Sequence, residues 1–395
     1  MKFSTSAPLR DGLLSVAVPQ RVAIPVDCQH KVVVKKKQVV GKGQVIAESG
    51  KGPFGLGYVH ASIDGIVEDI TPSTVVIGPL PVPEEGKTAP SVDHPAPRQD
   101  HKNLGGEELV RWLREMGIDT GKFHPTRALV VNGLNPEPGV TVSEQLLHSE
   151  RQVMDAGINV LERAMRPGNV YLVVARGKGL GLHGAHVVEV NPIYPATLDP
   201  LAVKAALGSE NPEAVDVISA SDVYRVGRVV TTGLPLTEAV VSAGEAVWRV
   251  PTGIPVGEVL AAAQMSVPSG ATVVLGGPMR GDAISSLETG VPENCTAITV
   301  IPPGIYPQVA PNPCINCGEC VLVCPARIQP GMLSRYAEFA LFDETRPRAI
   351  AACLDCGLCT YVCPANRPVL QYIRLAKRKL EERDAQLAVC RLSDE

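Results

Sequence analysis

The chain has 395 residues, of which 45% are hydrophobic and 4% aromatic, and its formal net charge is −4. This charge and the scarcity of aromatic side chains argue against a nucleic-acid surface, which needs a basic field or stacking platforms. No stretch approaches the roughly 20 uninterrupted apolar residues that a membrane span needs, and the first residues lack the apolar core of a secretory leader. We therefore expect a soluble protein of about two to four domains that stays in the cytoplasm.

The first domain is expected to be a small β-structure. Residues 22–70 contain short runs rich in β-branched residues, each bounded by glycine or polar turns, which is typical of strands. The runs span residues 22–26, 31–34, 39–47 and 60–67. The last two are similar to the hammerhead of lipoyl and biotinyl carriers, but no lysine lies at a matching hairpin tip. We expect a scaffold there and, over the proline-rich residues 79–103, a surface linker.

The central region, residues 96–245, is predicted to be an α/β domain. A helix is expected from Glu107, with Gly117 as its stop signal. The elements expected after it are a strand at 127–131, one helix over 143–165, a strand at 169–175 and shorter segments at 215–218 and 228–231. Strands that alternate with helices in this way predict a parallel sheet in a layered domain.

A glycine-rich loop follows the strand at 169–175. Residues 179–184 match the pattern G-x-G-x-x-G, but a dinucleotide site also needs a helix after the glycines to receive the pyrophosphate. Residues 185–190 predict a strand instead, so we expect a loop without a nucleotide. His183 and His186 have no third ligand at a convincing offset, so exposed histidines are expected rather than a metal pair.

The composition changes again over residues 246–285, which predict a small β-grasp module of the SLBB type. Residues 250–260 lead into a short helix, and a strand at 271–275 precedes the turn Gly276-Gly277-Pro278-Met279.

Eight of the eleven cysteines lie in two runs with the spacing Cys-x-x-Cys-x-x-Cys-x-x-x-Cys-Pro. The first run is Cys314, Cys317, Cys320 and Cys324, and the second is Cys353, Cys356, Cys359 and Cys363. This spacing is typical of two-cluster ferredoxins, in which the fourth cysteine of each run ligates the cluster of the other run. We therefore expect two [4Fe-4S] clusters. Cys314, Cys317, Cys320 and Cys363 are predicted to hold one cluster, and Cys353, Cys356, Cys359 and Cys324 the other.

Zinc and disulfides fit these runs less well. Structural zinc sites use pairs of Cys-x-x-Cys that give four ligands for each ion, whereas here three thiols recur at every third position. A disulfide framework suits a small secreted domain. Cys28, Cys295 and Cys390 have no ligand spacing, so we expect them to be small buried apolar residues without chemistry.

With the hammerhead, the Gly276–Met279 turn and the two cysteine runs following one another in this order, the chain resembles the C subunit of the Rnf ion-translocating electron-transport complex. Further matching stretches are residues 8–10, 130–133, 137–138, 141 and 369–372. The resemblance implies a barrel-sandwich hybrid and linker over 1–95, a Rossmann-like domain over 96–245, the SLBB-like module over 246–285 and a helical ferredoxin module over 300–395. It also implies a peripheral subunit at the cytoplasmic face of a bacterial or archaeal cell membrane. Such a subunit passes electrons between a ferredoxin-like or cytochrome carrier and membrane subunits that move sodium ions or protons.

Three departures from the family fall on its flavin and NADH site. The Gly-rich loop G-x-G-G-x-G-F-P-T of NADH-oxidising members is missing over residues 117–126, so the bare backbone that lets a phosphate approach is lost. The acidic-Cys-acidic-Pro stretch is Asn135-Pro136-Glu137-Pro138 here, and residues 193–197 lack the family's glycine pair. We therefore expect no FMN and no catalytic residues, with electrons entering or leaving through a redox protein that docks near the clusters.

One alternative function stays open. A degenerate loop can still bind FMN through backbone groups, which would make the chain an NAD(P)H dehydrogenase subunit or an enzyme of the related cobalamin-reductase type. A basic surface on the last helix, formed by Arg374, Lys377, Arg378, Lys379 and Arg383, has two interpretations as well. It is either a solvated face or a docking surface for an acidic carrier or an anionic membrane.

Overall fold

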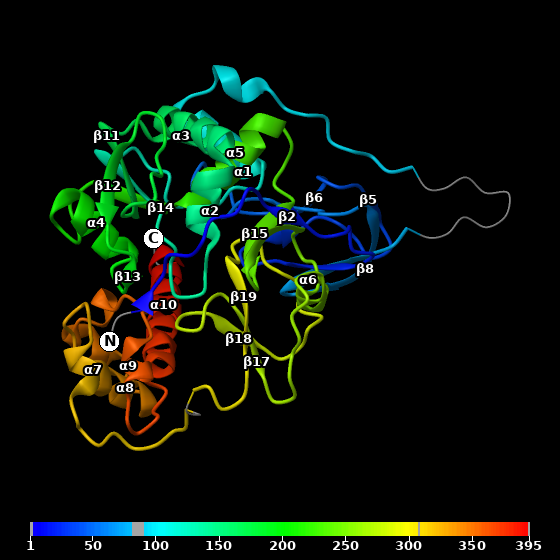
Figure 1. Ribbon diagram of the computed structural model, residues 1–395. Helices are drawn as coiled ribbons and strands as arrows, with labels where there is room; N and C mark the ends of the chain where they lie inside the picture. The colour runs from blue at the N-terminus through cyan, green and yellow to red at the C-terminus, as the bar shows by residue number, and fades with distance from the viewer. Residues whose placement is uncertain (1–2, 81–90, 307–308, 394–395) are drawn as a thin grey trace. The chain divides into compact units, whose positions relative to one another are not determined.

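The computed structural model describes residues 3–80, 91–306 and 309–393. The chain forms two compact units, Met1–Ile301 and Pro302–Glu395. The first unit is a mixture of β-sheets and an α/β layer, and the second is helical (Figure 1). The predicted mixed α/β and β fold class is thus confirmed at this level. The predicted linker at 79–103 falls partly outside the described residues, and its last four residues form a 3-10 turn, Asp100–Asn103.

The N-terminal region is a sandwich of two small antiparallel sheets. One sheet has the order β3-β9-β8-β5 and the other β4-β6-β7. Their strands are β3 (Val22–Pro25), β4 (Lys31–Val32), β5 (Val39–Val40), β6 (Val45–Glu48), β7 (Val59–His60), β8 (Gly65–Thr71) and β9 (Thr74–Gly78). Alternate residues of β3, among them Val22 and Ile24, are buried between the sheets, which is the pattern of a half-buried strand.

Two strands predicted as continuous are each broken into two. The run 39–47 separates into β5 and β6 at a turn in which Gly43 adopts a φ of +88° and Gln44 N–H donates to Gly41 O. The run 60–67 separates into β7 and β8 at a bend that contains Asp64, whose carboxylate accepts the Lys42 N–H at 2.7 Å. This hydrogen bond joins the two turns. The hammerhead is therefore held together by a contact between turns, and its strands are short.

The α/β layer contains a four-stranded parallel sheet with the order β12-β11-β10-β14. The strands are β10 (Ala128–Asn132), β11 (Asn169–Ala175), β12 (His186–Val190) and β14 (Val215–Ser219). The helices are α1 (Gly106–Glu115), α2 (Val142–Ser149), α3 (Arg151–Met165), α4 (Asp199–Leu207) and α5 (Ala220–Thr232). Leu129 and Val131 face α1, α3 and α5, whereas Val130 faces α4. The predicted parallel pairing is confirmed.

Helices α3 and α5 cross at two glycines. A Cβ on Gly157 would lie 2.2 Å from Val223 O, and a Cβ on Gly227 would lie 1.9 Å from Val153 O. No side chain fits at such distances, so glycine at both positions lets the two backbones touch.

Two predictions for this layer are wrong. The helix predicted over 143–165 is two helices, because Glu150 leaves the helical conformation (φ −116°, ψ 30°) and serves as N-cap of α3. Residues 228–231, predicted as a separate short element, lie within α5, which begins with a capping box between Ser219 and Asp222. That box supplies the helix start that the β-branched residues had obscured. The strand predicted at 185–190 is confirmed as β12.

The third part of the first unit is a six-stranded sheet with the order β18-β17-β19-β15-β16-β2. Its strands are β2 (Leu14–Ser15), β15 (Glu238–Ala243), β16 (Ala246–Pro251), β17 (Thr272–Leu275), β18 (Asp282–Ile284) and β19 (Ala297–Ile301). Helix α6 (Val256–Ala262) packs on it. The sheet therefore extends past the predicted 246–285 at both ends and includes a strand from the start of the chain.

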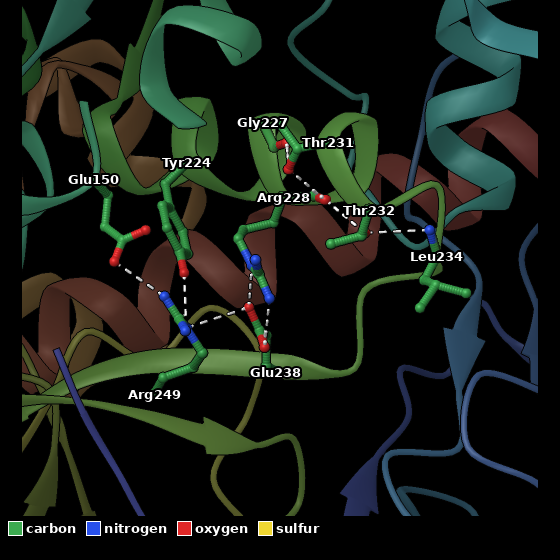
Figure 2. A network of polar contacts seen from close by, with 9 residues as sticks. All are labelled: Glu150, Tyr224, Gly227, Arg228, Thr231, Thr232, Leu234, Glu238 and Arg249. Carbon is green, nitrogen blue, oxygen red and sulfur yellow. Dashed lines mark hydrogen bonds and ion pairs between the residues drawn. The ribbon is translucent and has the colours of Figure 1, made fainter. Parts of the chain in front are cut away.

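A network of half-buried charges joins this sheet to the α/β layer (Figure 2). Arg249 of β16 donates to Glu150 at 3.1 Å and to the Tyr224 hydroxyl at 3.0 Å. Arg228 of α5 donates to Glu238 of β15 at 2.7 Å, and Glu238 also lies 3.6 Å from Arg249. Each cation thus has an anion within reach, so these charges are paired where they are partly removed from water.

The second unit is built around the long helix α10 (Val369–Ser393). The shorter elements are α7 (Glu319–Leu322), α8 (Pro330–Glu338), the 3-10 turns η2 (Asp343–Arg348) and η3 (Ile350–Ala352), and α9 (Leu358–Tyr361). Leu333, Ile373 and Ala376 are at the centre of its core. Of the helices in the described residues, none combines the length and the apolar content that crossing a membrane requires.

Candidate functional site

The two cysteine runs occupy equivalent local structures in the second unit. Each begins in a loop, continues into a one-turn helix, α7 or α9, and ends at a proline-containing turn. Left-handed backbone recurs at matching positions of the two runs, namely Asn316 and Asp355, Gly318 and Gly357, and Arg327 and Asn366. The repeat in sequence is therefore also a repeat in backbone conformation.

The left-handed residues turn the backbone of each cysteine loop at the same positions. Asn and Asp tolerate this conformation better than other residues with a side chain, because their short polar groups bond locally. Asn316 Oδ1 lies 3.7 Å from Cys314 Sγ, and Asp355 Oδ1 lies 3.6 Å from Cys353 Sγ. The residue just before the second cysteine of each run thus contacts the first thiol.

Thiols from both runs share one electrostatic environment. Burial raises the pKa of Cys359 most, and the negative charges of Cys356, Cys353, Cys320 and Cys324 raise this pKa further. Two of those four belong to the other run, and one of them is Cys324, its fourth cysteine. The sequence pattern predicts this meeting of the fourth cysteine with the opposite run.

Cys320 and Cys353 show the same balance. Burial raises the pKa of Cys320, and the neighbouring Cys314 and Cys317 charges add to the effect. Burial raises the pKa of Cys353 to about 11, and the charges of Asp355 and Cys356 act in the same direction. Several thiols gathered in a weakly polar place resist ionisation unless positive charge is added between them. Iron supplies that charge, so this donor set fits an iron–sulfur cluster.

Space is kept beside the first run by a glycine. A Cβ on Gly331 would lie 3.2 Å from Cys320 Sγ and 3.9 Å from Cys314 Sγ, and the Gly331 N–H bonds to the Cys320 sulfur. Within the described residues, no three His, Cys, Asp or Glu side chains are arranged to hold a single metal ion. A cubane is a different case, because its four thiolates each bind a separate iron and so lie farther apart than the ligands of one ion.

Charged side chains tie both cysteine loops to the helices. Lys377 of α10 donates to Cys353 O and to Asp355 at 2.8 Å each, and Arg335 of α8 donates to Asn316 at 3.5 Å. Arg367, only 1% exposed, donates to Glu338 at 2.6 Å and to Asn312 O at 2.8 Å. Sequence reasoning missed Arg367, because the only local signal is an arginine shortly after the last cysteine run.

The other residues singled out in the sequence form no site. Cys295 is buried, as expected, and donates to Ala297 O, but Cys28 is exposed, because it lies in the polar turn between β3 and β4, so the prediction of a buried residue was wrong there. The side chain of Cys390 lies outside the described residues. His183 and His186 are exposed.

The basic residues of α10 serve internal contacts in part. Besides Lys377, Lys379 pairs with Glu382, and Arg383 pairs with Asp343 and covers the Phe342 ring. The solvated face with local ion pairs is therefore the better of the two interpretations.

The carboxyl ends of the parallel strands form a second place to examine, because open α/β sheets bind their ligands there. The chain's own start lies across this edge. Residues 3–10, which we call the strap, begin with β1 (Phe3–Ser4) paired to β13 (Ile193–Tyr194). The strap then contacts the loops that follow β12, β11 and β10 in turn.

The contacts of the strap are polar and specific. Thr5 N–H donates to Pro192 O at 2.9 Å, after β12. Lys178, after β11, donates to Ala7 O at 2.8 Å. Asn135, after β10, donates to Thr5 O at 2.9 Å and is fully buried. The three strand ends are therefore capped by the protein itself.

Residues 117–126, where the family's flavin loop is missing, also make contacts within the chain. In residues 117–126, the Thr120 hydroxyl donates to Pro53 O at 2.7 Å, its N–H donates to Gly55 O, and His124 stacks on Phe54. These contacts hold the segment against the N-terminal sandwich.

Glu137 makes a further internal contact, with the turn that follows β17 in the six-stranded sheet. Its buried carboxylate accepts the N–H groups of Gly277, Met279 and Arg280 at 2.8–3.3 Å. Burial raises the pKa of Glu137, and these hydrogen bonds oppose the shift. The Gly276–Gly281 turn is thus occupied by an internal carboxylate.

Comparisons with known proteins agree with the two ends of the chain. Residues 4–79 match the RnfC barrel sandwich hybrid domain, and residues 307–367 match the 4Fe-4S dicluster domain. The resemblance to the C subunit of the Rnf complex is confirmed. Both the predicted N-terminal barrel-sandwich domain and the C-terminal cluster domain are confirmed as domain types.

Relatives known as the C subunit of an ion-translocating oxidoreductase complex match along most of the chain. The Rhodobacter capsulatus protein is 27% identical over 94% of this chain and 80% of its own length. The proteins of Edwardsiella ictaluri and Pseudomonas aeruginosa are each 29% identical over 97% of this chain. The chain spans 53% and 55% of the lengths of these two. Among solved structures, an NAD+-reducing [NiFe]-hydrogenase in the H2-reduced state matches 69% of this chain and 61% of its own, with 16% identity and a TM-score of 0.39.

Proposed function

We propose that the chain is a peripheral electron-transfer subunit of an Rnf-type ion-translocating oxidoreductase complex. The observation that carries the proposal is the pair of equivalent cysteine loops in one helical unit, within the 4Fe-4S dicluster match. When bound, two [4Fe-4S] clusters accept and release single electrons. RnfC proteins are similar to this chain over 94–97% of its length, and this similarity supports its assignment to an Rnf-type complex.

The ligand assignment is part of the proposal. Cys314, Cys317, Cys320 and Cys363 hold one cluster, and Cys353, Cys356, Cys359 and Cys324 hold the other. The electrostatic coupling of Cys359 to Cys324 supports the crossed arrangement. The chain's own groups then bury the thiols, contact them through Asn316 and Asp355, and donate an N–H from Gly331. Such hydrogen bonds and burial tune the potential of a bound cluster.

We further propose that the α/β domain binds neither FMN nor NADH. The strap occupies the carboxyl edge of the sheet through Thr5, Lys178 and Asn135, and Glu137 fills the turn at Gly277. Both features support a scaffold role for residues 96–245, between a barrel-sandwich domain over 1–95 and an SLBB-like module over 246–285. Electrons therefore enter and leave through proteins that dock near residues 300–395.

The partners that this function requires are a ferredoxin-like or cytochrome carrier and the membrane subunits of the complex. The chain works at the cytoplasmic face of a bacterial or archaeal cell membrane and contacts the membrane through those subunits. Similarity to RnfC proteins supports this placement.

Two measurements on anaerobically loaded protein test the function. We expect about eight iron atoms for each chain, reduction by dithionite, no flavin absorbance and no bleaching by NADH alone. Bleaching by NADH would favour the alternative function, an FMN-dependent NAD(P)H dehydrogenase subunit. Iron content near four, or zinc in place of iron, would contradict the two-cluster proposal.

Paired double variants test the crossed ligation. Cys324→Ala with Cys356→Ala removes two ligands of the same proposed cluster, so about four iron atoms remain. Cys324→Ala with Cys317→Ala removes one ligand from each cluster, and both clusters are lost or damaged. If each cluster were held by a single run, the second variant would be the one that keeps about four iron atoms.

A further inference from the structure

The surface around the first cysteine run is unusually apolar. Ile315 is 62% exposed, Leu322 is 79% exposed and Phe339 is 69% exposed, whereas apolar side chains on a monomer's surface are normally scattered singly. We propose that these residues, together with Val321 and Met332, form the docking face for a redox protein that exchanges electrons with the first cluster. The proposal rests on the proposed function, because the face has this meaning only if Cys314, Cys317 and Cys320 hold a cluster.

The five residues come from three neighbouring elements. Ile315 lies in the loop between Cys314 and Cys317, and Val321 and Leu322 lie in α7, between Cys320 and Cys324. Met332 and Phe339 lie at the start of α8 and at its C-cap. Because they are seven residues apart, they lie on one side of the helix.

Two contacts make these elements one surface. Arg335, which lies between Met332 and Phe339 on the same side of α8, donates to Asn316, the residue next to Ile315. Helices α7 and α8 also pack against each other (Figure 1). The five apolar side chains therefore come from elements that border the first cysteine loop.

The position of the face indicates a redox partner. Cys317, one of the proposed ligands, is itself exposed within the loop that the face borders. Electron transfer weakens steeply with distance, so a protein seated here brings its own cofactor as close to the first cluster as the fold allows. A partner that only anchors the subunit has no reason to bind at an exposed ligand.

The charges of the face indicate an apolar partner surface. Its cation, Arg335, is bound to Asn316, and Glu319 at the start of α7 supplies an opposite charge. A lipid surface would instead attract a cluster of lysines and arginines. We therefore expect a partner with an apolar rim around its cofactor and an association that depends little on salt.

The test uses the loaded full-length chain and membranes of the source cell from which the native subunit has been deleted. The double variant Leu322→Ser with Phe339→Ser removes the two most exposed side chains. Since neither is buried, we expect the fold and the iron content to be unchanged. The control is Val187→Ser with Leu234→Ser, which removes exposed apolar residues of the first unit.

The rate at which the reduced chain is re-oxidised by these membranes is the main readout, with ferricyanide as a small oxidant that needs no docking. We expect the Leu322/Phe339 variant to react with membranes about tenfold more slowly, and with ferricyanide at the original rate. The Val187/Leu234 variant should react normally with both. Raising the salt concentration to about 0.5 M should change the membrane rate less than about twofold.

The following results would overturn the docking face. If the fully loaded Leu322/Phe339 variant transferred electrons to membranes at the original rate, the docking face would be wrong and the proposed function would stand. Equal slowing with ferricyanide would show damage to the cluster. Binding of the original chain, but not the variant, to protein-free lipid vesicles, or its self-association through the face, would assign another occupant. A chain that loads no iron would instead contradict the proposed function.

Discussion

Arg249 donates to Glu150 at 3.1 Å, and this contact joins β16 of the six-stranded sheet to the point where two helices of the α/β layer meet. The same guanidinium donates to the Tyr224 hydroxyl, which is buried in α5. Burial raises the pKa of Tyr224 to about 12, so the hydroxyl stays neutral and accepts this bond throughout the physiological range. Arg249 is therefore the cation on which both layers depend (Figure 2).

Replacement of Arg249 by methionine is expected to destabilise the first unit by about 1–2 kcal/mol, because the half-buried Glu150 carboxylate and the buried Tyr224 hydroxyl lose their donor. Thermal unfolding followed by circular dichroism measures the effect. Arg10→Met is the control, since its pair with Glu245 is exposed, and exposed pairs contribute little. Equal melting temperatures for both variants would contradict the role of the network.

The glycines at the crossing of α3 and α5 give a second prediction. Gly227→Ala places a methyl group 1.9 Å from Val153 O, which neither helix can avoid without moving apart. We expect a loss of more than about 3 kcal/mol in the free energy of unfolding. Gly181→Ala is the matched control, because its Cβ would meet nothing closer than 3.7 Å. Denaturant unfolding of both variants is the measurement, and a stable Gly227→Ala protein would mean that the helices cross elsewhere.

Local signals in the sequence predicted most elements of this fold. Strands β10, β11, β12 and β14 and their parallel pairing follow from short β-branched runs that alternate with helices. One failure has a distant cause and the other a local one. The helix break at Glu150 depends on Arg249, which is distant in sequence, and the start of α5 depends on a Ser219–Asp222 box that was not recognised.

The cysteine loops were predictable from the sequence, whereas the strap across the parallel sheet was not. The cysteine loops are recognisable because spacing, left-handed residues and ligands all lie within a few positions of one another. The strap was not predictable, because Thr5 meets Pro192 and Asn135 over more than a hundred residues. The periodicity of a single sequence does not reveal contacts between residues so far apart. For the same reason, β2 was not predicted to join the six-stranded sheet.

The strap itself can be tested through Asn135. Its side chain donates to Thr5 O and accepts the Glu144 N–H at 3.2 Å, so Asn135→Ala leaves two buried backbone groups unsatisfied. We expect a loss of about 1–3 kcal/mol and faster amide exchange in residues 3–10. Gln38→Ala, which removes an exposed turn contact to Lys35, should leave exchange in residues 3–10 unchanged. If exchange there were equally slow in both variants, the strap would be held by other contacts.

The dependence of stability on acid pH follows from His60, which lies in β7 where the N-terminal sandwich meets the end of α1. Burial lowers the pKa of this imidazole from 6.5 to about 4 in the folded protein. The unfolded chain therefore binds the proton more readily, so the stability that the neutral ring provides is complete above pH 6.5 and is lost as the pH falls towards 4. The loss amounts to about 3 kcal/mol.

His60→Gln keeps a polar side chain but cannot titrate, so its free energy of unfolding should fall by about 3 kcal/mol less than that of the original protein between about pH 7 and pH 4. Denaturant unfolding at a series of pH values gives this difference directly, and other groups cancel because they are common to both proteins. His183→Gln, which alters an exposed histidine, should leave the pH dependence unchanged. If the His60→Gln curve stayed parallel to the original across this range, protonation of the buried ring would not be what weakens the fold in acid.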